Sequence, residues 1–126
     1  MSAAAFAEIA RLLADYFDGL HHGDVEKFAS VFHPKAIYAT ADQPAFLHRT
    51  MEEYLPIVAA RPSPASRGEP RRDHIDEIQL AGANTALARV RCSIGGADFV
   101  DFLSLARADG QWRVIAKVFQ IIEREA

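Results

Sequence analysis

Cysteine is nearly absent from this chain of 126 residues, since Cys92 is the single one. One cysteine excludes an internal disulfide framework and is typical of a reducing compartment. Long apolar runs are also missing, because Glu8, Arg11 and Asp15 interrupt the apolar pattern of residues 1–17. That pattern predicts an amphipathic helix and argues against a signal peptide or a membrane span. We therefore expect a cytoplasmic protein that has no membrane partner.

A strong charge of either sign is missing as well. The net charge is −3, and the basic doublet Arg71-Arg72 is flanked by Glu69 and Asp73. Such a balance gives no general attraction for nucleic acid. Half of the residues are hydrophobic and a quarter are charged, as in ordinary globular proteins. We expect one domain over residues 1–126.

The sequence also lacks the familiar catalytic and cofactor motifs, including G-x-S-x-G, the P-loop and G-x-G-x-x-G. His21 and His22 do not indicate a metal site, because adjacent side chains on a helix point about 100° apart. Nothing near Cys92 indicates a lowered thiol pKa, so we expect a small inward-facing apolar residue there. We expect no metal and no cofactor.

The first part of the chain predicts helices. Its apolar residues recur at three- and four-residue spacing, which predicts a helix from about 3 to 21. Asp24 can cap a second short helix that ends before Pro34. Two short strands are expected at Ala36–Thr40 and Phe46–His48, around a turn at 42–44. The residues of the first apolar face are Phe6, Ile9, Leu13, Tyr16, Phe17 and Leu20.

Thr50 and Glu53 form a capping box that predicts a third helix, Met51–Ala60. Pro56 lies inside it, and we expect a kink or a late start because proline removes a helical hydrogen bond. The loop Arg61–Arg72 is rich in proline and glycine. It is either a solvated connector or a lid over a pocket.

From Asp73 onward the apolar period becomes two, which predicts four antiparallel strands: His74–Leu80, Thr85–Ile94 and a final ribbon turning at Asp109-Gly110. Strict alternation places Phe102, Ser104, Ile115, Lys117, Phe119 and Ile121 on one face of the ribbon, and Phe99, Leu103, Leu105, Trp112, Val114 and Val118 on the other. Because both faces are apolar, both should be covered. Helices followed by a meander favour the α+β class.

Several short motifs resemble the nuclear-transport-factor-2-like superfamily. They are Tyr16-Phe17-Asp18-Gly19, His22-Gly23-Asp24 and Phe32-His33-Pro34-Lys35-Ala36. The end of the chain is similar to the branch of putative lumazine-binding proteins, through Asp101-Phe102-Leu103-Ser104-Leu105, Trp112 and Lys117-Val118-Phe119. The resemblance implies a cone-shaped barrel with a strongly curved, mainly antiparallel sheet wrapped over three N-terminal helices. It further implies a pocket between helices and concave sheet, and a homodimer through the other face.

The steroid isomerases of this superfamily give a sharper comparison. Their oxyanion-hole tyrosine corresponds to Tyr16, but their carboxylate base corresponds to Thr40 and their second acid to Ser104. Threonine cannot take a proton from carbon near neutral pH, so we do not expect that reaction. We also expect Asp101 and Arg91 to lie on the opposite face from Ser104 and Cys92, which leaves no catalytic set of the hydrolase or dehydratase kind.

Our first hypothesis is a binding protein for a small hydrophobic or planar ligand. Apolar walls with a few convergent polar groups are typical of such pockets. Tyr16, Ser104 and Lys117 would supply the polar contacts, and a lysine facing a closed cavity should have a lowered pKa. The remaining predicted ligand-binding residues are Phe32, Tyr38, Phe102 and Phe119 in the walls and His48 at the rim.

Two alternatives remain open. In an enzyme of the dehydratase, isomerase or cyclase kind, Tyr16 would stabilise an enolate oxygen and Lys117 or His33 would move a proton. His33 can equally well donate to the last helical carbonyls. In a dimerisation or interaction module, the protein's own side chains would fill the cavity.

Overall fold

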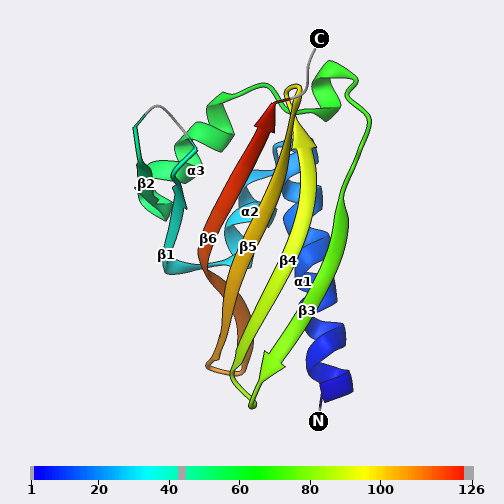
Figure 1. The fold of residues 1–126 in the computed structure, drawn as a ribbon, viewed down its shortest axis with the longest axis vertical. Helices are drawn as coiled ribbons and strands as arrows, with labels where there is room; N and C mark the ends of the chain where they lie inside the picture. Colours follow the sequence, from blue (N-terminus) through cyan, green and yellow to red (C-terminus); the bar gives the residue numbers. More distant parts are fainter. Residues whose placement is uncertain (1, 43–44, 124–126) are drawn as a thin grey trace.

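The computed structural model of the protein describes residues 2–42 and 45–123. Its elements follow one another as helices, two short strands, a third helix and a four-stranded meander (Figure 1). The helices are α1 (Ser2–His22), α2 (Val25–Val31), α3 (Met51–Ala60) and the short 3-10 helix η1 (Ala65–Arg67). The strands are β1 (Phe32–Thr40), β2 (Leu47–Thr50), β3 (His74–Ala81), β4 (Thr85–Ile94), β5 (Ala97–Ala108) and β6 (Gln111–Glu123).

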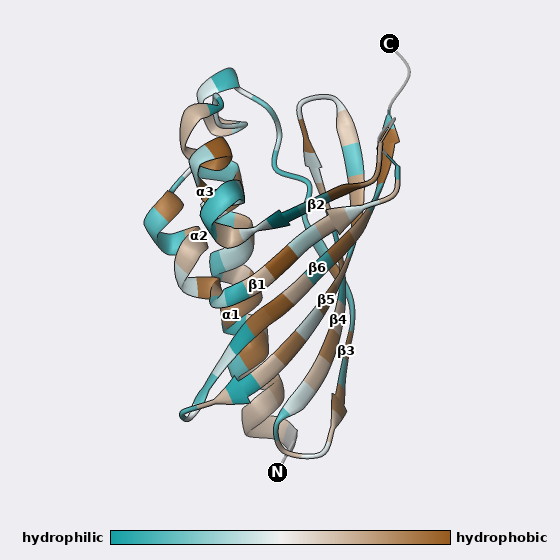
Figure 2. Ribbon diagram, turned by 90° about the vertical axis from the view of Figure 1, so that its left-hand side faces the viewer, coloured by the Kyte–Doolittle hydropathy of each residue, from teal (hydrophilic) through white to brown (hydrophobic). Residues whose placement is uncertain are grey.

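All six strands form one sheet in the order β2-β1-β6-β5-β4-β3. The pair β1–β6 is parallel and the other pairs are antiparallel. The sheet is curved, and the helices cover one of its faces (Figure 2). We call this helix-covered face concave and the other face convex. The predicted α+β class and mainly antiparallel sheet are confirmed.

Local sequence signals explain the helix boundaries. The side chain of Asp24 accepts a hydrogen bond from the Lys27 amide and caps α2. Thr50 and Glu53 form the predicted capping box of α3. We predicted a kink or a late start at Pro56; the helix begins at Met51, so it does not start late, and the kink stays a prediction. The capping box satisfies the first amides of the helix, where a proline downstream has no influence.

A glycine allows α1 and α2 to pack closely. A Cβ atom at Gly19 would lie 2.7 Å from the Cβ atom of Phe28 and 2.9 Å from its Cα atom. Any larger residue would force the two helices apart, because these neighbours cannot move independently of α2. Gly19 therefore fixes the position of Phe28, which is fully buried.

Strand β1 begins at Phe32, four residues earlier than predicted, and includes Pro34. Its pairing with β6 is irregular between Phe32 and Ile37. Proline is tolerated in such an irregular part of a strand, because no ladder donor is required there. The predicted turn at Asp109-Gly110 is confirmed, with φ of 53° and 76°. Of the predicted turn at 42–44, Gln43 and Pro44 lie outside the described residues.

A β-bulge in β6 changes which residues share a face. Ser104 pairs with Ala116, whereas Leu105 pairs with Val114, so Ile115 is an extra residue on β6. Trp112 and Val114 consequently lie on the same, concave face as Lys117 and Phe119; all four are buried. The strict alternation predicted from the sequence is wrong at this point.

The strand β5 places Leu103 and Leu105 in the core. Phe102 and Ser104, which we predicted to face the pocket with Lys117, are exposed on the convex face instead. Phe102 pairs with Val118, which is also exposed. Within residues 2–42 and 45–123, no helix is both long and apolar enough to cross a membrane.

Candidate functional site

Three polar side chains meet in the core between α1 and the concave face. The Tyr16 hydroxyl donates a hydrogen bond of 2.6 Å to Oδ2 of Asp101. Lys117 Nζ lies 4.0 Å from the same oxygen. Tyr16 and Asp101 are 0% exposed and Lys117 is 5% exposed. Charged side chains are seldom buried so deeply, and we call this group the charged centre.

Aromatic rings surround the ammonium group of Lys117. Its Nζ atom lies 5.0 Å from the ring centroid of Tyr16, 5.4 Å from Tyr38, 5.5 Å from Phe119, 5.7 Å from Tyr54 and 6.0 Å from Phe28. At such distances a ring face attracts a cation. Tyr38 also stacks on Tyr54 with the centroids 3.9 Å apart. We call these five rings the aromatic cage.

The surroundings of the charged centre change its acid–base properties. Burial, the largest single influence, lowers the pKa of Lys117, but its neighbours Tyr54, Asp101, Cys92 and Tyr38 together raise it by more, so the net shift is upward. The lowered pKa that we expected is therefore wrong, because Asp101 was not expected beside it. Burial and Asp101 also raise the pKa of Tyr16. At neutral pH Lys117 is a cation and Tyr16 is a hydrogen-bond donor.

Cys92 borders the charged centre from β4. It is buried, which confirms the predicted inward orientation, and its Sγ atom lies 4.0 Å from Oδ2 of Asp101. The prediction that Asp101 and Cys92 face opposite sides of the sheet is wrong. Burial and the Asp101 carboxylate raise the pKa of the Cys92 thiol to about 12. The thiol stays protonated at neutral pH and is no nucleophile.

Two buried side-chain polar atoms have no hydrogen-bond partner among the described residues. They are Oδ1 of Asp101 and Nη2 of Arg61. Arg61 follows α3 and precedes Pro62, and its backbone is extended, with φ of −82° and ψ of 148°. Proline favours that conformation in the preceding residue. Pro62 thus ends α3 and sets the backbone from which the guanidinium projects.

The structure brings together five of the predicted site residues and separates four others. Tyr16, Phe32, Tyr38, Lys117 and Phe119 lie within one set of ring and charge contacts. The residues it places elsewhere are His33, His48, Phe102 and Ser104.

His33 lies at the β5–β6 turn, beside a small cavity of about 50 Å³ that Asp109 and Gln111 also line. Its Nδ1 atom accepts a hydrogen bond of 3.0 Å from the Lys35 amide, and among the described residues it donates none to a helical carbonyl. His48 is exposed on the edge strand β2. Neither histidine belongs to the charged centre.

Sequence reasoning missed Asp101, Tyr54 and Arg61. Asp101 pairs with Phe119 across the sheet, so a correct face assignment of β5 would have found it. Tyr54 is on the buried face of α3 with Met51 and Val58, and this three- and four-residue spacing was a usable signal. Arg61 lies in an irregular loop, where the sequence has no periodicity to show its direction.

A groove of about 440 Å³ opens beside the charged centre at the ends of β4 and β5. Cys92 and Phe99 line the groove and also border the site. The ring centroid of Phe99 lies 5.9 Å from that of Phe119. The nearby loop is tied to α1 by an ion pair of 2.6 Å between Arg71 and Asp18. The lining of the groove also includes His74, Arg91 and Ile122, which are exposed, so the groove opens mainly on the convex side of the sheet.

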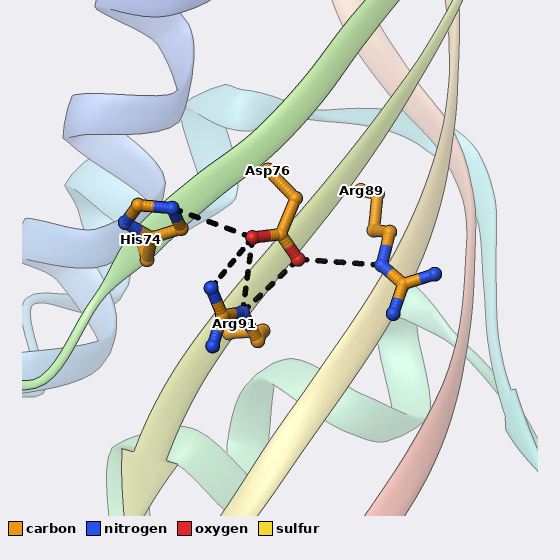
Figure 3. Close-up of polar contacts among 4 residues, drawn as sticks. All are labelled: His74, Asp76, Arg89 and Arg91. Atoms are coloured by element: carbon orange, nitrogen blue, oxygen red, sulfur yellow. Dashed lines mark hydrogen bonds and ion pairs between the residues drawn. The ribbon is translucent and has the colours of Figure 1, made fainter.

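A second ionic group lies on the convex face, where His74, Asp76, Arg89 and Arg91 form the outer ion cluster (Figure 3). Arg91 holds Asp76 through Nη2 at 2.7 Å and Nε at 3.0 Å, and Arg89 approaches to 3.3 Å. Nε2 of His74 lies 3.4 Å from Oδ1 of Asp76. The guanidinium of Arg89 also lies 5.6 Å from the ring of exposed Phe102.

Known proteins support the fold and the family. A family model described as "Putative lumazine-binding" matches residues 4–120. An NTF2-like protein of unknown function from Shewanella baltica has a TM-score of 0.85 at 20% identity, with 96% of each chain covered. One from Silicibacter pomeroyi has a TM-score of 0.82 at 20% identity, covering 96% of this chain and 98% of that one.

A ketosteroid isomerase-like protein from Erwinia carotovora atroseptica is also similar, with a TM-score of 0.72 at 12% identity, over 93% of this chain and 95% of that one. At these identities the similarity concerns the fold alone. A search of curated proteins finds no significant match.

Proposed function

We propose, since the chain belongs to the family described as Putative lumazine-binding, that it binds a small planar or hydrophobic molecule at the charged centre. The ligand would lie between α1, α3 and the concave face, against the aromatic cage. Apolar walls with a few polar groups inside are the usual composition of a ligand site.

The observation that carries this proposal is the unpartnered Oδ1 atom of Asp101 inside a fully buried aromatic environment. Buried carboxylate oxygens normally have a hydrogen-bond partner, because an unsatisfied one costs free energy. A purely structural core would gain stability by replacing these charged residues with apolar ones. A donor group on a ligand would satisfy Oδ1.

Access to the charged centre requires side chains to move. Tyr16, Asp101 and Lys117 are shielded by the cage, in which Tyr38 is only partly buried. An entering ligand would displace Phe119 or Tyr38, whose ring centroids lie 4.7 Å apart, and stack in their place. Rotamer changes of this kind are common on binding.

Titration of the labelled protein with planar probes tests the proposal. The probes are lumazine, 2-naphthoate and 6-hydroxy-2-naphthoate, followed by amide chemical shifts in two-dimensional NMR. We expect at least one probe to bind with shifts centred on residues Tyr16, Asp101 and Lys117. Perturbations confined to the convex face would refute the site. If no probe binds at all, the interaction-module alternative, with a core filled by Phe28 and Tyr54, is favoured.

We propose a homodimer through the convex face as the second part of this function. Four large apolar residues are exposed there on neighbouring strands: Leu87 (37% exposed), Phe102 (52%), Val118 (48%) and Ile122 (45%). Soluble monomers rarely leave a contiguous patch of this kind in water. A second copy of the chain would cover it with the same patch, as a two-fold axis requires.

A second candidate function is proton-transfer catalysis, which the 2.6 Å hydrogen bond between Tyr16 and Asp101 favours. The Tyr16 hydroxyl would turn its hydrogen from Asp101 to a developing oxyanion on the substrate, and the freed Asp101 carboxylate would exchange the proton. Lys117 is a poor base because its pKa is raised. An enzyme of this kind should show a bell-shaped pH profile that is lost in Tyr16→Phe; turnover that survives this change would exclude the mechanism.

A further inference from the structure

A long segment joins α3 to β3 and includes η1 (Figure 1). We call this segment, residues 61–73, the strap. Only Pro64 is buried within it. Among the described residues, its backbone hydrogen bonds stay inside the strap or connect Arg61 to α3, as in the bond of 3.0 Å from the Glu69 amide to the Pro64 carbonyl. Segments with so few buried contacts are the ones that open locally.

Side-chain contacts hold the strap against the elements on either side. Nη1 of Arg71 lies 2.6 Å from Oδ1 of Asp18 on α1. The Gly95 amide, in the turn between β4 and β5, donates a hydrogen bond of 3.0 Å to Oε1 of Glu69. The side chains of Arg71 and Asp18 are 37% and 35% exposed, and exposed ion pairs contribute little to stability. Both contacts can therefore break without disturbing a helix or the sheet.

A small cavity of about 10 Å³ lies beneath the strap, which is room for roughly one water molecule. Its walls come from the end of α1, from the strap and from the end of β4. The lining residues that carry the argument are Phe17, Pro64, Arg71 and Cys92. The buried residue of the strap, Pro64, thus closes the cavity on its outer side.

The inner walls of this cavity border the charged centre. Cys92 is one of them, and its Sγ atom lies 4.0 Å from Oδ2 of Asp101. Phe17 is another, and its ring centroid lies 5.6 Å from that of Tyr16. One side chain therefore separates the cavity from each partner of the hydrogen bond between Tyr16 and Asp101. Because α1 forms one wall, the cavity lies on the helix-covered, concave side of the sheet.

We propose that the strap is a cover over the entrance to the charged centre: it opens when Arg71 releases Asp18 and Glu69 releases the Gly95 amide, and a ligand then passes between α1 and the end of β4. This inference depends on the proposed binding function and adds the route to the site. Lifting Pro64 out of the cavity exposes Cys92 and Phe17, the side chains next to Asp101 and Tyr16.

Labelling of Cys92 with iodoacetamide measures the opening without any ligand. Cys92 is the single cysteine, so the reagent reports on one position of the full chain. Burial and Asp101 raise the pKa of its thiol to about 12, so labelling at pH 8 requires the strap to open. Asp18→Ala removes the partner of Arg71 but no part of the cavity lining. We expect this variant to be labelled about threefold faster than the wild-type protein.

Two control variants should keep the wild-type labelling rate. Lys27→Ala removes the other ion pair of Asp18, which measures 3.7 Å and comes from α2 instead of the strap. Arg91→Gln changes the lining of the groove on the convex side, through which a reagent could also approach Cys92. Labelling in low concentrations of urea separates opening from unfolding, because global unfolding exposes more surface and depends more steeply on denaturant.

The labelling results decide whether the strap is a cover. Equal rates in Asp18→Ala and the wild-type protein overturn it, as does a labelling rate with the urea dependence of global unfolding. Faster labelling in Arg91→Gln alone places the route on the convex side and overturns it too.

Ligand kinetics separate this inference from the proposed function. The probe is the tightest binder among lumazine, 2-naphthoate and 6-hydroxy-2-naphthoate, and its association rate in stopped flow should rise about threefold in Asp18→Ala, as the labelling rate does. An unchanged association rate overturns the entrance while the binding function stands. Absence of binding by all three probes overturns the binding function and the entrance, even if Cys92 labelling shows that the strap opens.

Discussion

The two faces of one sheet each hold a carboxylate paired with at least one basic side chain, in opposite surroundings. On the concave face Asp101 is fully buried, with Tyr16 and Lys117 as partners. On the convex face Asp76 is bound by Arg89, Arg91 and His74 in contact with solvent (Figure 3). The outer ion cluster has more partners, yet water and salt can replace each of them.

The difference shows that the number of ion pairs does not measure their importance. A buried pair is costly to form but even more costly to break, because the remaining charge has no solvent to stabilise it. An exposed pair can be lost with little consequence. We therefore expect the concave face to be sensitive to single substitutions and the convex face to tolerate them, as the following tests examine.

The largest effect is expected for Asp101→Ala, which leaves Lys117 buried and unpaired. The free energy of unfolding should fall by about 3–5 kcal/mol, measured by urea denaturation. Asp76→Ala, the same change on the convex face, is the matched control and should cost far less. Adding Lys117→Met to an Asp101→Leu variant should restore most of the stability, and a double variant no better than Asp101→Ala would refute the pairing.

Tyr16→Phe removes the donor to Asp101 and keeps the ring. Hydrogen bonds to charged groups contribute about 1.5–3 kcal/mol, so a loss of that size is expected in thermal or urea unfolding. Tyr54→Phe is the control, since the Tyr54 hydroxyl does not bond to Asp101. Equal losses in both variants would show that the 2.6 Å hydrogen bond adds nothing to the free energy of unfolding beyond the loss of a buried hydroxyl.

Phe102→Asp tests whether a second copy covers the convex face. The dissociation constant of the dimer should rise at least tenfold, which corresponds to about 1.4 kcal/mol, in analytical ultracentrifugation. Phe46→Asp is the control, because Phe46 is 69% exposed and precedes β2. A wild-type protein that is monomeric at high concentration would contradict the dimer.

The smallest effect is expected for Asp76→Asn. The hydrogen bond from Arg91 lowers the pKa of Asp76 below its ordinary value. Because its pKa is lower in the folded protein, ionised Asp76 adds stability at pH values above its unfolded-state pKa of about 3.9. This contribution is lost as the pH falls through its folded-state pKa. The difference in melting temperature between pH 7 and pH 3 should therefore be slightly smaller in Asp76→Asn than in the wild-type protein. In 1 M NaCl the two proteins should show the same difference. A large effect would mean that the cluster is not screened.

The sequence could predict most of the fold because each helix has its own signals. Asp24 and the Thr50–Glu53 box mark helix starts, and Asp109-Gly110 marks the hairpin. The resemblance to the nuclear-transport-factor-2-like superfamily is likewise confirmed by the family match and the structural similarity.

The site was only partly predictable. Tyr16 and Lys117 were selected from the sequence, and the structure places them together, although their functional roles remain predictions. The face of β5 relative to β6 was misassigned because the bulge in β6 falls within Val114, Ile115 and Ala116. These residues are all apolar, so no break in the alternation of polar and apolar residues marks the bulge. The position of Asp101 follows from that register, which only the paired strands define.

The place of β6 in the sheet has a consequence for how the chain is made. β6 lies between β1 and β5, so the earliest strand and the meander are joined only through it. During synthesis, β1 would leave the ribosome without its parallel neighbour and would stay unpaired on that side until β6 has emerged. A nascent chain stalled before Gln111 should therefore be protease-sensitive and in need of chaperones, however complete its helices are.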